Sequence, residues 1–464
     1  MIDILHFVAS KLQQGVSSAF HLLTIGYFQS LEKHSVTTAH SIPPEMKNIV
    51  ILGGSYAGVS TAHRILKQAA KSPNGIMPYK ITLISPNTDL YWNMASPRAI
   101  LPGQLTDDQI FQPISAGFKK YPASQFEFIL GSATSMDVTR KTVTISTTGG
   151  LSDADADALK SRVLDYDHLI LATGSRARND TPLKGLESTE KTKAALRHFQ
   201  GRIEKAKVIV VAGGGVTGVE VAGELGFQYG RTKEIVLFGL PLKNADSPHF
   251  DHHTDRERYE DLEESPASVS HLATKALQDL NVKVRFQTRV TSTSSTSNDG
   301  IDKPGLPLTL TLSDNTTIQT DMYIPSFGLT PNSSYIPTQY LTPDGYVLID
   351  EFMNVKADGE AALPNVWALG DVADLEYAQF VSCDKQSVHL AKNMLRTLKD
   401  GGGGKKAELV RYKASTKRFM GLQIGRKAGT GHFGTIRIPS FVIVWARKNL
   451  FIENLRPTVD GSLF

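Results

Sequence analysis

A strand followed by a glycine-rich turn and a helix constrains this fold more than any other feature of the sequence. The strand-like run Asn48–Leu52 leads into Gly53-Gly54-Ser55-Tyr56-Ala57-Gly58, and the helical stretch Val59–Ala70 follows. In this context the turn places backbone N–H groups and the positive end of the helix dipole where a pyrophosphate can bind. Ser55 occupies the position of the usual middle glycine, so this copy of the dinucleotide fingerprint is imperfect.

The same pattern recurs 160 residues later with a complete fingerprint. The run Lys207–Ala212 precedes Gly213, Gly215 and Gly218, and the helix Val219–Phe227 comes next. Two pyrophosphate sites in one chain indicate two dinucleotides, of which a flavin and a nicotinamide are the economical pair. The alternative is two ordinary glycine-rich connections without a ligand. The pattern predicts an α/β fold with two Rossmann-like domains, each a parallel sheet covered by helices.

Three further strand-like runs end in motifs that can face these sites. Tyr166–Ser175 is apolar and ends in Ala-Thr-Gly, with Thr173 and Gly174 at the turn. Asp321–Asn332 ends in Gly-x-x-Pro-Asn. A third strand runs into Gly370-Asp371, and the carboxylate at its end can accept a hydrogen bond from a ribityl hydroxyl.

Cys383 is the only cysteine among 464 residues, so the chain has no dithiol to relay electrons and no internal disulfide. This favours a reducing compartment, either cytoplasmic or mitochondrial or at a lipid surface, over secretion. The 50 basic and 46 acidic residues leave a net charge of +4, which gives no reason to expect a nucleic-acid partner. The length is typical of two or three domains.

The first 31 residues carry one apolar helical stripe, with apolar side chains every three or four positions from Leu5 to Leu31. The stretch Leu12–Leu31 has no charge over 20 residues, but its many polar side chains argue against a transmembrane span. Asp3 stands where a signal peptide would be basic. Two interpretations remain, a helix packed on its own domain or an amphipathic helix on a membrane surface.

Pro241–Ser270 is a polar segment rich in charge and histidine. Its cluster Asp251, His252, His253 and Asp255 contains metal-ligating residue types. No ligand set at a fixed helical spacing accompanies the cluster, so a solvated loop is favoured and no metal is expected.

Thr291–Gly305 is rich in Ser, Thr and Asn and is predicted to be the long loop of a hairpin. The strands of that hairpin would be Val282–Val290 and Leu306–Leu312. Gly401–Gly404 is predicted to be a flexible connector before the C-terminal segment.

Together these motifs resemble the two-dinucleotide-binding-domain flavoproteins of the pyridine nucleotide-disulfide oxidoreductase superfamily. The likeness is strongest to the apoptosis-inducing-factor-like branch, which includes ferroptosis suppressor protein 1 and fungal homologues. It covers roughly residues 47–455 and draws also on Leu90–Arg98 and on the tail Gly421–Phe451.

The resemblance implies roles for individual residues. It places Glu220 near the flavin and the nicotinamide, as the candidate catalytic residue. NAD(P)H would be held by Gly213, Gly215 and Gly218. The residues that would contact FAD are Gly53, Gly54, Ser55, Tyr56, Ala57, Gly58, Arg98, the backbone at Ala133, Thr173, Gly174, Gly370 and Asp371.

Some positions depart from the family pattern. Besides Ser55, Ser85 stands where the family often has an acid for the FAD adenosine ribose. The strand Ile235–Phe238 ends at Gly239 without an acid, and Lys243 follows, so the sequence does not distinguish NADH from NADPH. No role is carried over to Arg447 or Lys448, which stand near the place of a lysine found in some family members.

The resemblance implies hydride transfer from NAD(P)H to FAD and electron transfer onward to a quinone-type acceptor. The alternatives are a specialised-metabolite substrate, dioxygen, or a signalling flavoprotein with weak catalysis. The expected domain order is a linker region 1–43, the FAD domain 44–178 and 330–400, the NAD(P) domain 179–329 between its two parts, and a C-terminal segment 405–464 on the acceptor side.

Overall fold

The computed structural model describes residues 46–69, 79–148, 159–240, 265–295, 307–400, 408–415 and 419–464. The N-terminal stripe, the cluster Asp251 to Asp255 and Gly401–Gly404 lie outside these residues. Within them, no helix has the combined length and apolar character needed to cross a membrane.

The first sheet has seven strands in the order β18-β8-β1-β2-β5-β6-β7. Its centre is β1, which pairs in parallel with β2 on one side and β8 on the other. Short apolar runs in the sequence form these central strands because both faces of the sheet are covered. The strands are β1 (Lys47–Leu52), β2 (Tyr79–Ser85), β5 (Phe126–Asp137), β6 (Thr142–Thr148), β7 (Leu159–Asp165), β8 (His168–Leu171) and β18 (Val366–Ala368).

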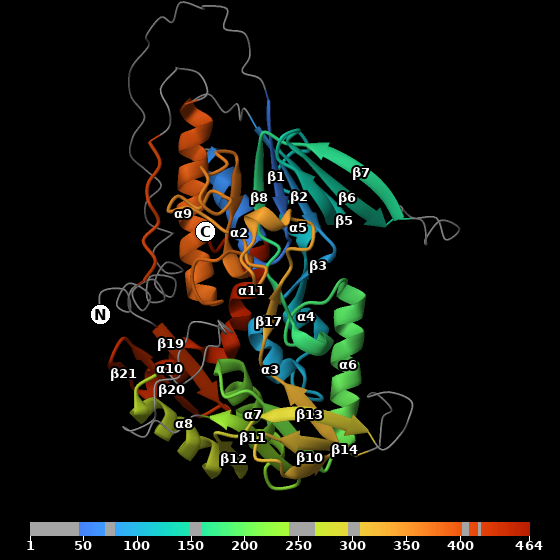
Figure 1. Ribbon diagram of the computed structural model, residues 1–464, viewed down its shortest axis with the longest axis vertical. Helices are drawn as coiled ribbons and strands as arrows, with labels where there is room; N and C mark the ends of the chain where they lie inside the picture. Colours follow the sequence, from blue (N-terminus) through green and yellow to red (C-terminus); the bar gives the residue numbers. More distant parts are fainter. Residues whose placement is uncertain are drawn as a thin grey trace, which may run out of the picture. The chain divides into compact units, whose positions relative to one another are not determined.

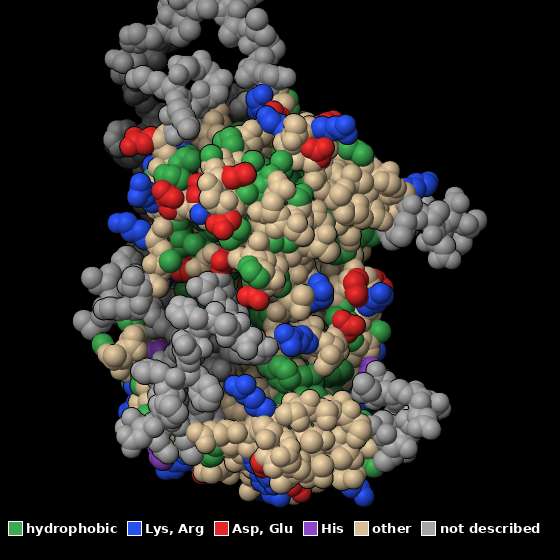
Figure 2. All heavy atoms as spheres, in the orientation of Figure 1, with side chains coloured by type: hydrophobic (Ala, Val, Ile, Leu, Met, Phe, Trp, Pro, Cys, Tyr) green, Lys and Arg blue, Asp and Glu red, His purple; other side chains and the backbone are tan. Residues whose placement is uncertain are grey.

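The second sheet has four parallel strands in the order β12-β11-β10-β16. An antiparallel sheet β13-β14-β15 packs beside it through a small core that includes Val210, Phe238 and Leu310. The strands are β10 (Val208–Ala212), β11 (Glu234–Leu240), β12 (Val282–Phe286), β16 (Met322–Pro325), β13 (Val290–Ser295), β14 (Leu308–Leu312) and β15 (Thr317–Thr320). On the face drawn in Figure 2, the surfaces over β5–β7 and β13–β14 are largely tan, as expected for strands rich in Thr and Ser.

Helices follow the strands as a doubly wound fold requires, which confirms the predicted α/β class. The long helices α2 and α9 lie side by side, although they come from opposite ends of the described chain (Figure 1). The longer helices are α2 (Tyr56–Ala69), α6 (Thr189–Lys205), α7 (Val216–Tyr229), α8 (Ala267–Asp279) and α9 (Phe380–Asp400). Shorter elements are β3 (Asp89–Tyr91), η1 (Asn93–Ala95), α3 (Ser96–Ala99), α4 (Asp107–Ile110), β4 (Phe111–Pro113), α5 (Ile114–Gly117), β9 (Ser175–Ala177), η2 (Arg178–Asp180), β17 (Leu329–Pro331), η4 (Thr338–Tyr340) and η5 (Gly370–Val372).

The C-terminal residues form a three-stranded antiparallel sheet followed by short helices. The sheet packs on α7, where a Cβ added to Gly223 would stand 2.8 Å from the backbone nitrogen of Gly425. The last helix, α11, packs on α2 (Figure 1). These elements are β19 (Phe419–Ile424), β20 (Ala428–Phe433), β21 (Ile436–Ile438), α10 (Ser440–Ala446), η6 (Lys448–Asn454) and α11 (Leu455–Val459).

Residues 459–464 fasten this C-terminal helix to α2. His63 Nε2 lies 2.8 Å from the carbonyl oxygen of Val459, and burial lowers the pKa of the imidazole to about 4, so the ring is neutral and can donate. Lys67 Nζ donates to the carbonyl oxygens of Gly461 and Phe464, each at 2.7 Å. The Arg64 guanidinium lies 4.4 Å from the centre of the Phe464 ring.

Among the described residues, the predicted strands and helices are present, with two differences. Both helices that follow the glycine turns begin three residues earlier than predicted, at Tyr56 and Val216. The hairpin was wrong in its first strand, because Gln287, at φ +50°, separates β12 in the parallel sheet from β13. β13 lies mostly inside the expected loop and is the strand that pairs with β14, since its alternating Thr and Ser suit a half-exposed strand.

Candidate functional site

The first glycine turn lies at the carboxyl end of β1, between the ends of β2 and β8. The Gly53 N–H donates to the carbonyl oxygen of Ile84 with an N···O distance of 2.8 Å, which links the turn to β2. A Cβ on Gly58 would stand 1.8 Å from the carbonyl oxygen of Gly53, so helix and turn touch backbone to backbone. A Cβ on Gly54 would stand 2.7 Å from Ser85 Oγ, which places Ser85 directly beside the turn, as its family position predicts.

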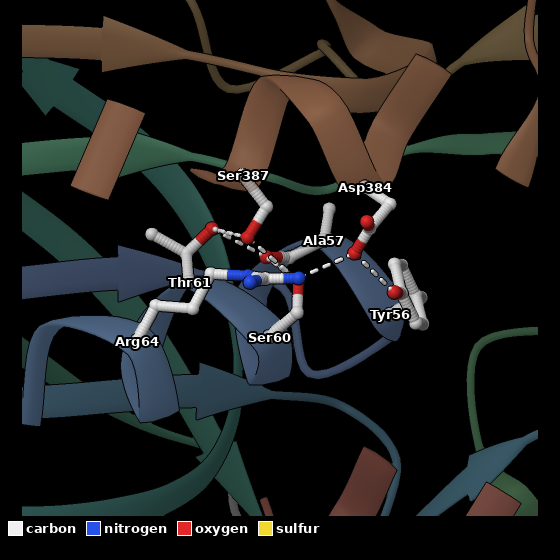
Figure 3. Close-up of polar contacts among 7 residues, drawn as sticks. All are labelled: Tyr56, Ala57, Ser60, Thr61, Arg64, Asp384 and Ser387. Atoms are coloured by element: carbon white, nitrogen blue, oxygen red, sulfur yellow. Dashed lines mark hydrogen bonds and ion pairs between the residues drawn. The ribbon is translucent and has the colours of Figure 1, made fainter. Parts of the chain in front are cut away.

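Side chains from α9 fix the start of α2 (Figure 3). The Tyr56 hydroxyl donates to Asp384 Oδ1 at 2.6 Å, and Arg64 Nη2 lies 2.5 Å from the same oxygen. One turn along α9, Ser387 Oγ lies 2.9 Å from Ser60 Oγ and 3.1 Å from Thr61 Oγ1. Because Tyr56 belongs to the fingerprint, this network sets the position of the first-turn N–H groups of α2, which have no partner within the helix.

The other strand-end residues meet at the same edge of the first sheet. Thr173 Oγ1 donates to the carbonyl oxygen of Asn332 at 2.7 Å, and Gly174 turns the chain with φ +65°. Asp371 follows β18, and its Oδ2 lies 2.6 Å from Lys184 Nζ and 3.0 Å from Ser175 Oγ. Burial opposes ionisation of Asp371, but Lys184 and Ser175 outweigh it and lower the pKa of the carboxyl group, so it is an acceptor at neutral pH.

Ala133 lies in β5 beyond the part that pairs with β2, at a register shift opposite β6. The resemblance assigned its backbone to FAD, and the strand does extend past the carboxyl ends of the parallel strands. The contact itself remains a prediction.

The second glycine turn repeats the first at the end of β10. A Cβ on Gly218 would stand 1.9 Å from the carbonyl oxygen of Gly213, and Gly215 begins α7 as its N-cap. Beside this turn, the Ser326 hydroxyl is buried and has no hydrogen-bond partner among the described residues. Gly239, at the end of β11, takes φ +100° and lies so close that its Cβ would stand 3.2 Å from the Gly214 nitrogen. An unpaired hydroxyl next to a glycine turn fits a bound dinucleotide.

Two glutamates of α7 bind arginines from different parts of the chain. Glu220 Oε1 accepts the Gln423 N–H at 3.1 Å and lies 2.9 Å from Arg447 Nη2. One turn later, Glu224 pairs with Arg98 of α3 through contacts of 2.6 and 3.1 Å, with both side chains at most 4% exposed. The four-residue spacing of the glutamates was a signal that could have indicated Glu224.

Arg98 and Arg447 therefore hold α7 from two sides. The guanidinium of Arg98, which the resemblance assigned to FAD, is occupied by Glu224, and its FAD contact remains a prediction. Arg447, for which no role was predicted, is the partner of Glu220. Burial raises the pKa of the Glu220 carboxyl group, although Arg447 and the Gln423 N–H lower it. Arg447 Nε and Gln423 Oε1 are buried without a partner among the described residues.

Four aromatic rings form a wall next to the first turn: Tyr56, Trp92, Phe380 and Phe451. Tyr56 and Phe380 have centroids 4.5 Å apart, and Phe380 lies 5.9 Å from Trp92 and 6.0 Å from Phe451. The Trp92 indole N–H donates to the carbonyl oxygen of Leu450 at 3.0 Å. Leu450 and Phe451 have φ of +55° and +57°, a costly conformation for such side chains and one that concentrates at functional sites.

Cys383 is buried near the start of α9, and burial raises the pKa of its thiol. A buried, protonated thiol is inert, which agrees with a packing role. No group of three or more His, Cys, Asp or Glu side chains within the described ranges is arranged to hold a metal ion.

Comparisons with known proteins agree with this geometry. The family model "Pyridine nucleotide-disulphide oxidoreductase" matches residues 47–396. The chain is 44% identical over 420 residues to oxidoreductase ptaL of Pestalotiopsis fici, covering 90% of this chain and 100% of that protein. It is 25% identical to apoptosis-inducing factor 1 of Saccharomyces cerevisiae, covering 89% and 98%. These likenesses confirm the resemblance read from the motifs.

A solved structure shares the fold. NDH2 from Plasmodium falciparum in complex with RYL-552 superposes with a TM-score of 0.62 at 12% identity, covering 89% of this chain and 100% of that chain. FAD and NAD(P)H are the cofactors that the family implies, and the two glycine turns, with the unpaired Ser326 hydroxyl, fit them. The chain thus belongs to the pyridine nucleotide-disulphide oxidoreductase family.

Proposed function

We propose that the protein passes hydride from NAD(P)H to FAD and electrons onward to a flat, conjugated acceptor of the quinone type. Bound at the two turns, the nicotinamide would supply the hydride and the flavin would store the electrons. The proposal rests on the wall of Tyr56, Trp92, Phe380 and Phe451, in which the partly exposed Phe380 ring can stack on a flat conjugated molecule and the three buried rings hold it in place.

The chain's own residues would position the reactants. The turns at Gly53 and Gly213 would bind the pyrophosphates, and Asp371, which is ionised, would accept from a hydroxyl of the flavin side chain. Glu220 and Arg447 would orient α7, and with it the nicotinamide half of the second site. Cys383 is the sole cysteine and is buried, so the family's dithiol relay does not operate here.

The test separates the two half-reactions. Anaerobic stopped-flow mixing with NADH or NADPH measures flavin bleaching, and a panel of short-chain quinones, dioxygen and a disulfide then measures reoxidation. We expect rapid bleaching, rapid reoxidation by quinones, and no reaction with the disulfide. Bleaching that is absent with both nucleotides would instead favour a signalling flavoprotein.

A matched pair of variants tests the wall. Phe380→Leu removes a ring from the wall, whereas Phe111→Leu removes a buried ring that stacks on Tyr91 at 4.8 Å and is not part of the wall. Only Phe380→Leu should raise the KM for quinone, by ~10-fold, which corresponds to about 1.4 kcal/mol. Bleaching by NAD(P)H should be unchanged in both. Equal effects of the two variants would contradict an acceptor site at the wall.

A small aromatic metabolite is the second candidate acceptor, since the Phe380 ring would stack on it as well. Specialised-metabolite substrates therefore belong in the acceptor panel. A turnover number well above that of every quinone would identify the protein as a tailoring enzyme.

A further inference from the structure

The C-terminal segment exposes three large apolar side chains within ten residues. Ile436, Phe441 and Trp445 are 64%, 75% and 49% exposed, and they are three of the seven exposed large hydrophobic residues in the described part of the chain. Phe441 and Trp445 are four residues apart on α10 and share one face of the helix. The opposite face carries Ile443, which is buried against the glycines of β19 and β20. We call Ile436, Phe441 and Trp445 the apolar patch.

The sequence segment that carries the patch has charge of one sign. Between Glu408 and Glu453 the sequence has nine Lys and Arg and no Asp or Glu, whereas the rest of the chain has 41 basic and 46 acidic residues. Arg437 and Lys448 flank the patch and are exposed. The apolar patch therefore lies in a strongly basic segment of a nearly neutral chain.

We propose that the apolar patch docks on an anionic lipid surface. Trp and Phe side chains partition to the boundary between headgroups and acyl chains, and cations beside them attract acidic headgroups. A second copy of the chain is the poorer partner, because a symmetric contact would bring two such basic segments together. Three apolar side chains and a few cations give weak, reversible binding rather than a permanent anchor.

The docking surface is connected to the candidate site along the chain. Arg447, the C-cap residue of α10, lies two residues after Trp445 and pairs with Glu220. A membrane docked at the patch would thus lie next to the C-terminal segment, and a lipid-soluble acceptor is concentrated in such a membrane. The docking itself does not depend on the proposed function, and its test requires no turnover.

Trp445 is a built-in reporter of docking. The chain has three tryptophans, and the other two, Trp92 and Trp367, are at most 1% exposed. Full-length protein is mixed with vesicles of phosphatidylcholine and phosphatidylserine, or of phosphatidylcholine alone. Only the anionic vesicles should shift Trp445 emission to the blue and protect it from acrylamide, and added salt should reverse both effects.

Two variants separate the apolar and the electrostatic parts. Ile436→Ser with Phe441→Ser keeps the reporter and should lower the partition coefficient on anionic vesicles by at least ~10-fold. Arg437→Gln with Lys448→Gln should weaken binding to anionic vesicles and reduce its dependence on salt. Val163→Ser is the control, because Val163 is 60% exposed on β7 and lies outside the patch. All variants should retain their flavin content.

Three results would overturn the proposal. The first is Trp445 emission and quenching that vesicles leave unchanged, even if the protein sediments with them through another segment. The second is equal vesicle binding by the Ile436/Phe441 double variant and the Val163 control. The third is protection of Trp445 that appears with rising protein concentration in the absence of lipid, which would assign the patch to a second copy.

Discussion

Replacing Glu220 by Gln tests whether this buried carboxylate is kept for function or for stability. The carboxylate is 4% exposed on α7 and touches the Gln423 N–H and Arg447. Burial raises its pKa above the ordinary 4.5, so the charged form is less well tolerated in the folded protein than the neutral form. Gln has nearly the same shape as the neutral acid, and we therefore expect the substitution to leave the stability unchanged or to increase it.

The sign follows from proton linkage. At pH values between the ordinary pKa and the raised pKa, the folded state binds more protons than the unfolded state. As the pH rises through this window, the contribution of Glu220 to the free energy of unfolding therefore decreases. Each unit by which the pKa is raised corresponds to about 1.4 kcal/mol in favour of the Gln variant above the window. Below it, where Glu220 is protonated in both states, the wild type and the variant should be equally stable.

Glu224→Gln is the matched control one turn further along α7. Both oxygens of Glu224 accept from Arg98, and both side chains are at most 4% exposed, so the substitution leaves a buried guanidinium without its counter-charge. Breaking such a pair costs about 3–5 kcal/mol. Glu224→Gln should therefore be much less stable than Glu220→Gln, while its flavin-loaded fraction should bleach at nearly the wild-type rate.

Thermal unfolding across pH and anaerobic stopped-flow bleaching by NADH measure the two properties. Glu220→Gln should slow bleaching by ~10-fold or more, about 1.4 kcal/mol in the barrier. The positioning role would be refuted if Glu220→Gln bleached at the wild-type rate and lost as much stability as Glu224→Gln. In that case Glu220 would serve only to complement the helix dipole and to pair with Arg447.

Gly215→Val should fold, because Gly215 has φ −75°, but the added side chain should block the pyrophosphate of the nicotinamide. The variant should therefore stay yellow and bleach slowly with NAD(P)H. Loss of FAD with retained nicotinamide binding would mean that the two loops are assigned the wrong way round. Cys383→Ser should keep most of the quinone rate, and a fall beyond ~10-fold, about 1.4 kcal/mol, would reveal a thiol role. Asp384→Asn removes the charge shared by Tyr56 and Arg64 and should weaken FAD binding by roughly 10-fold in a fluorescence titration, with nicotinamide affinity unchanged. If the apolar stripe lies on a membrane, deleting residues 1–40 should spare flavin content and short-chain quinone reduction but lower vesicle co-sedimentation and long-chain quinone turnover. Aggregation or loss of FAD would instead place the stripe in the core of its own domain.

The parts of the fold that are local in sequence could be predicted. A strand, a glycine turn and the first turns of a helix lie within about 20 residues, and close backbone contact leaves little choice but glycine at Gly58 and Gly218. The strand ends at Thr173 and Asp371 were recognisable because parallel strands deliver their carboxyl ends to one edge. The boundaries of the domains remain a prediction.

The rest depends on contacts between distant residues, which one sequence does not display. Glu220 and Gln423 are 203 positions apart, and neither has a local pattern that names the other or Arg447. The hairpin was misplaced because Val282–Val290 is uniformly strand-like, and the single left-handed residue Gln287 gives no compositional warning. The aromatic wall likewise joins four segments, each unremarkable on its own.

The docking of residues 459–464 on α2 has a consequence for synthesis. Lys67 and Phe464 are 397 residues apart, and at ~5–20 residues per second a ribosome needs roughly 20–80 s to make the intervening chain. Tyr56 and Arg64 receive their partner Asp384 only when α9 is made, and the two carbonyl oxygens that Lys67 binds come still later, with residues 461–464. The first half of the FAD site is therefore translated early but is assembled only after residues 461–464 emerge, so flavin loading is expected long after the first glycine turn has been made.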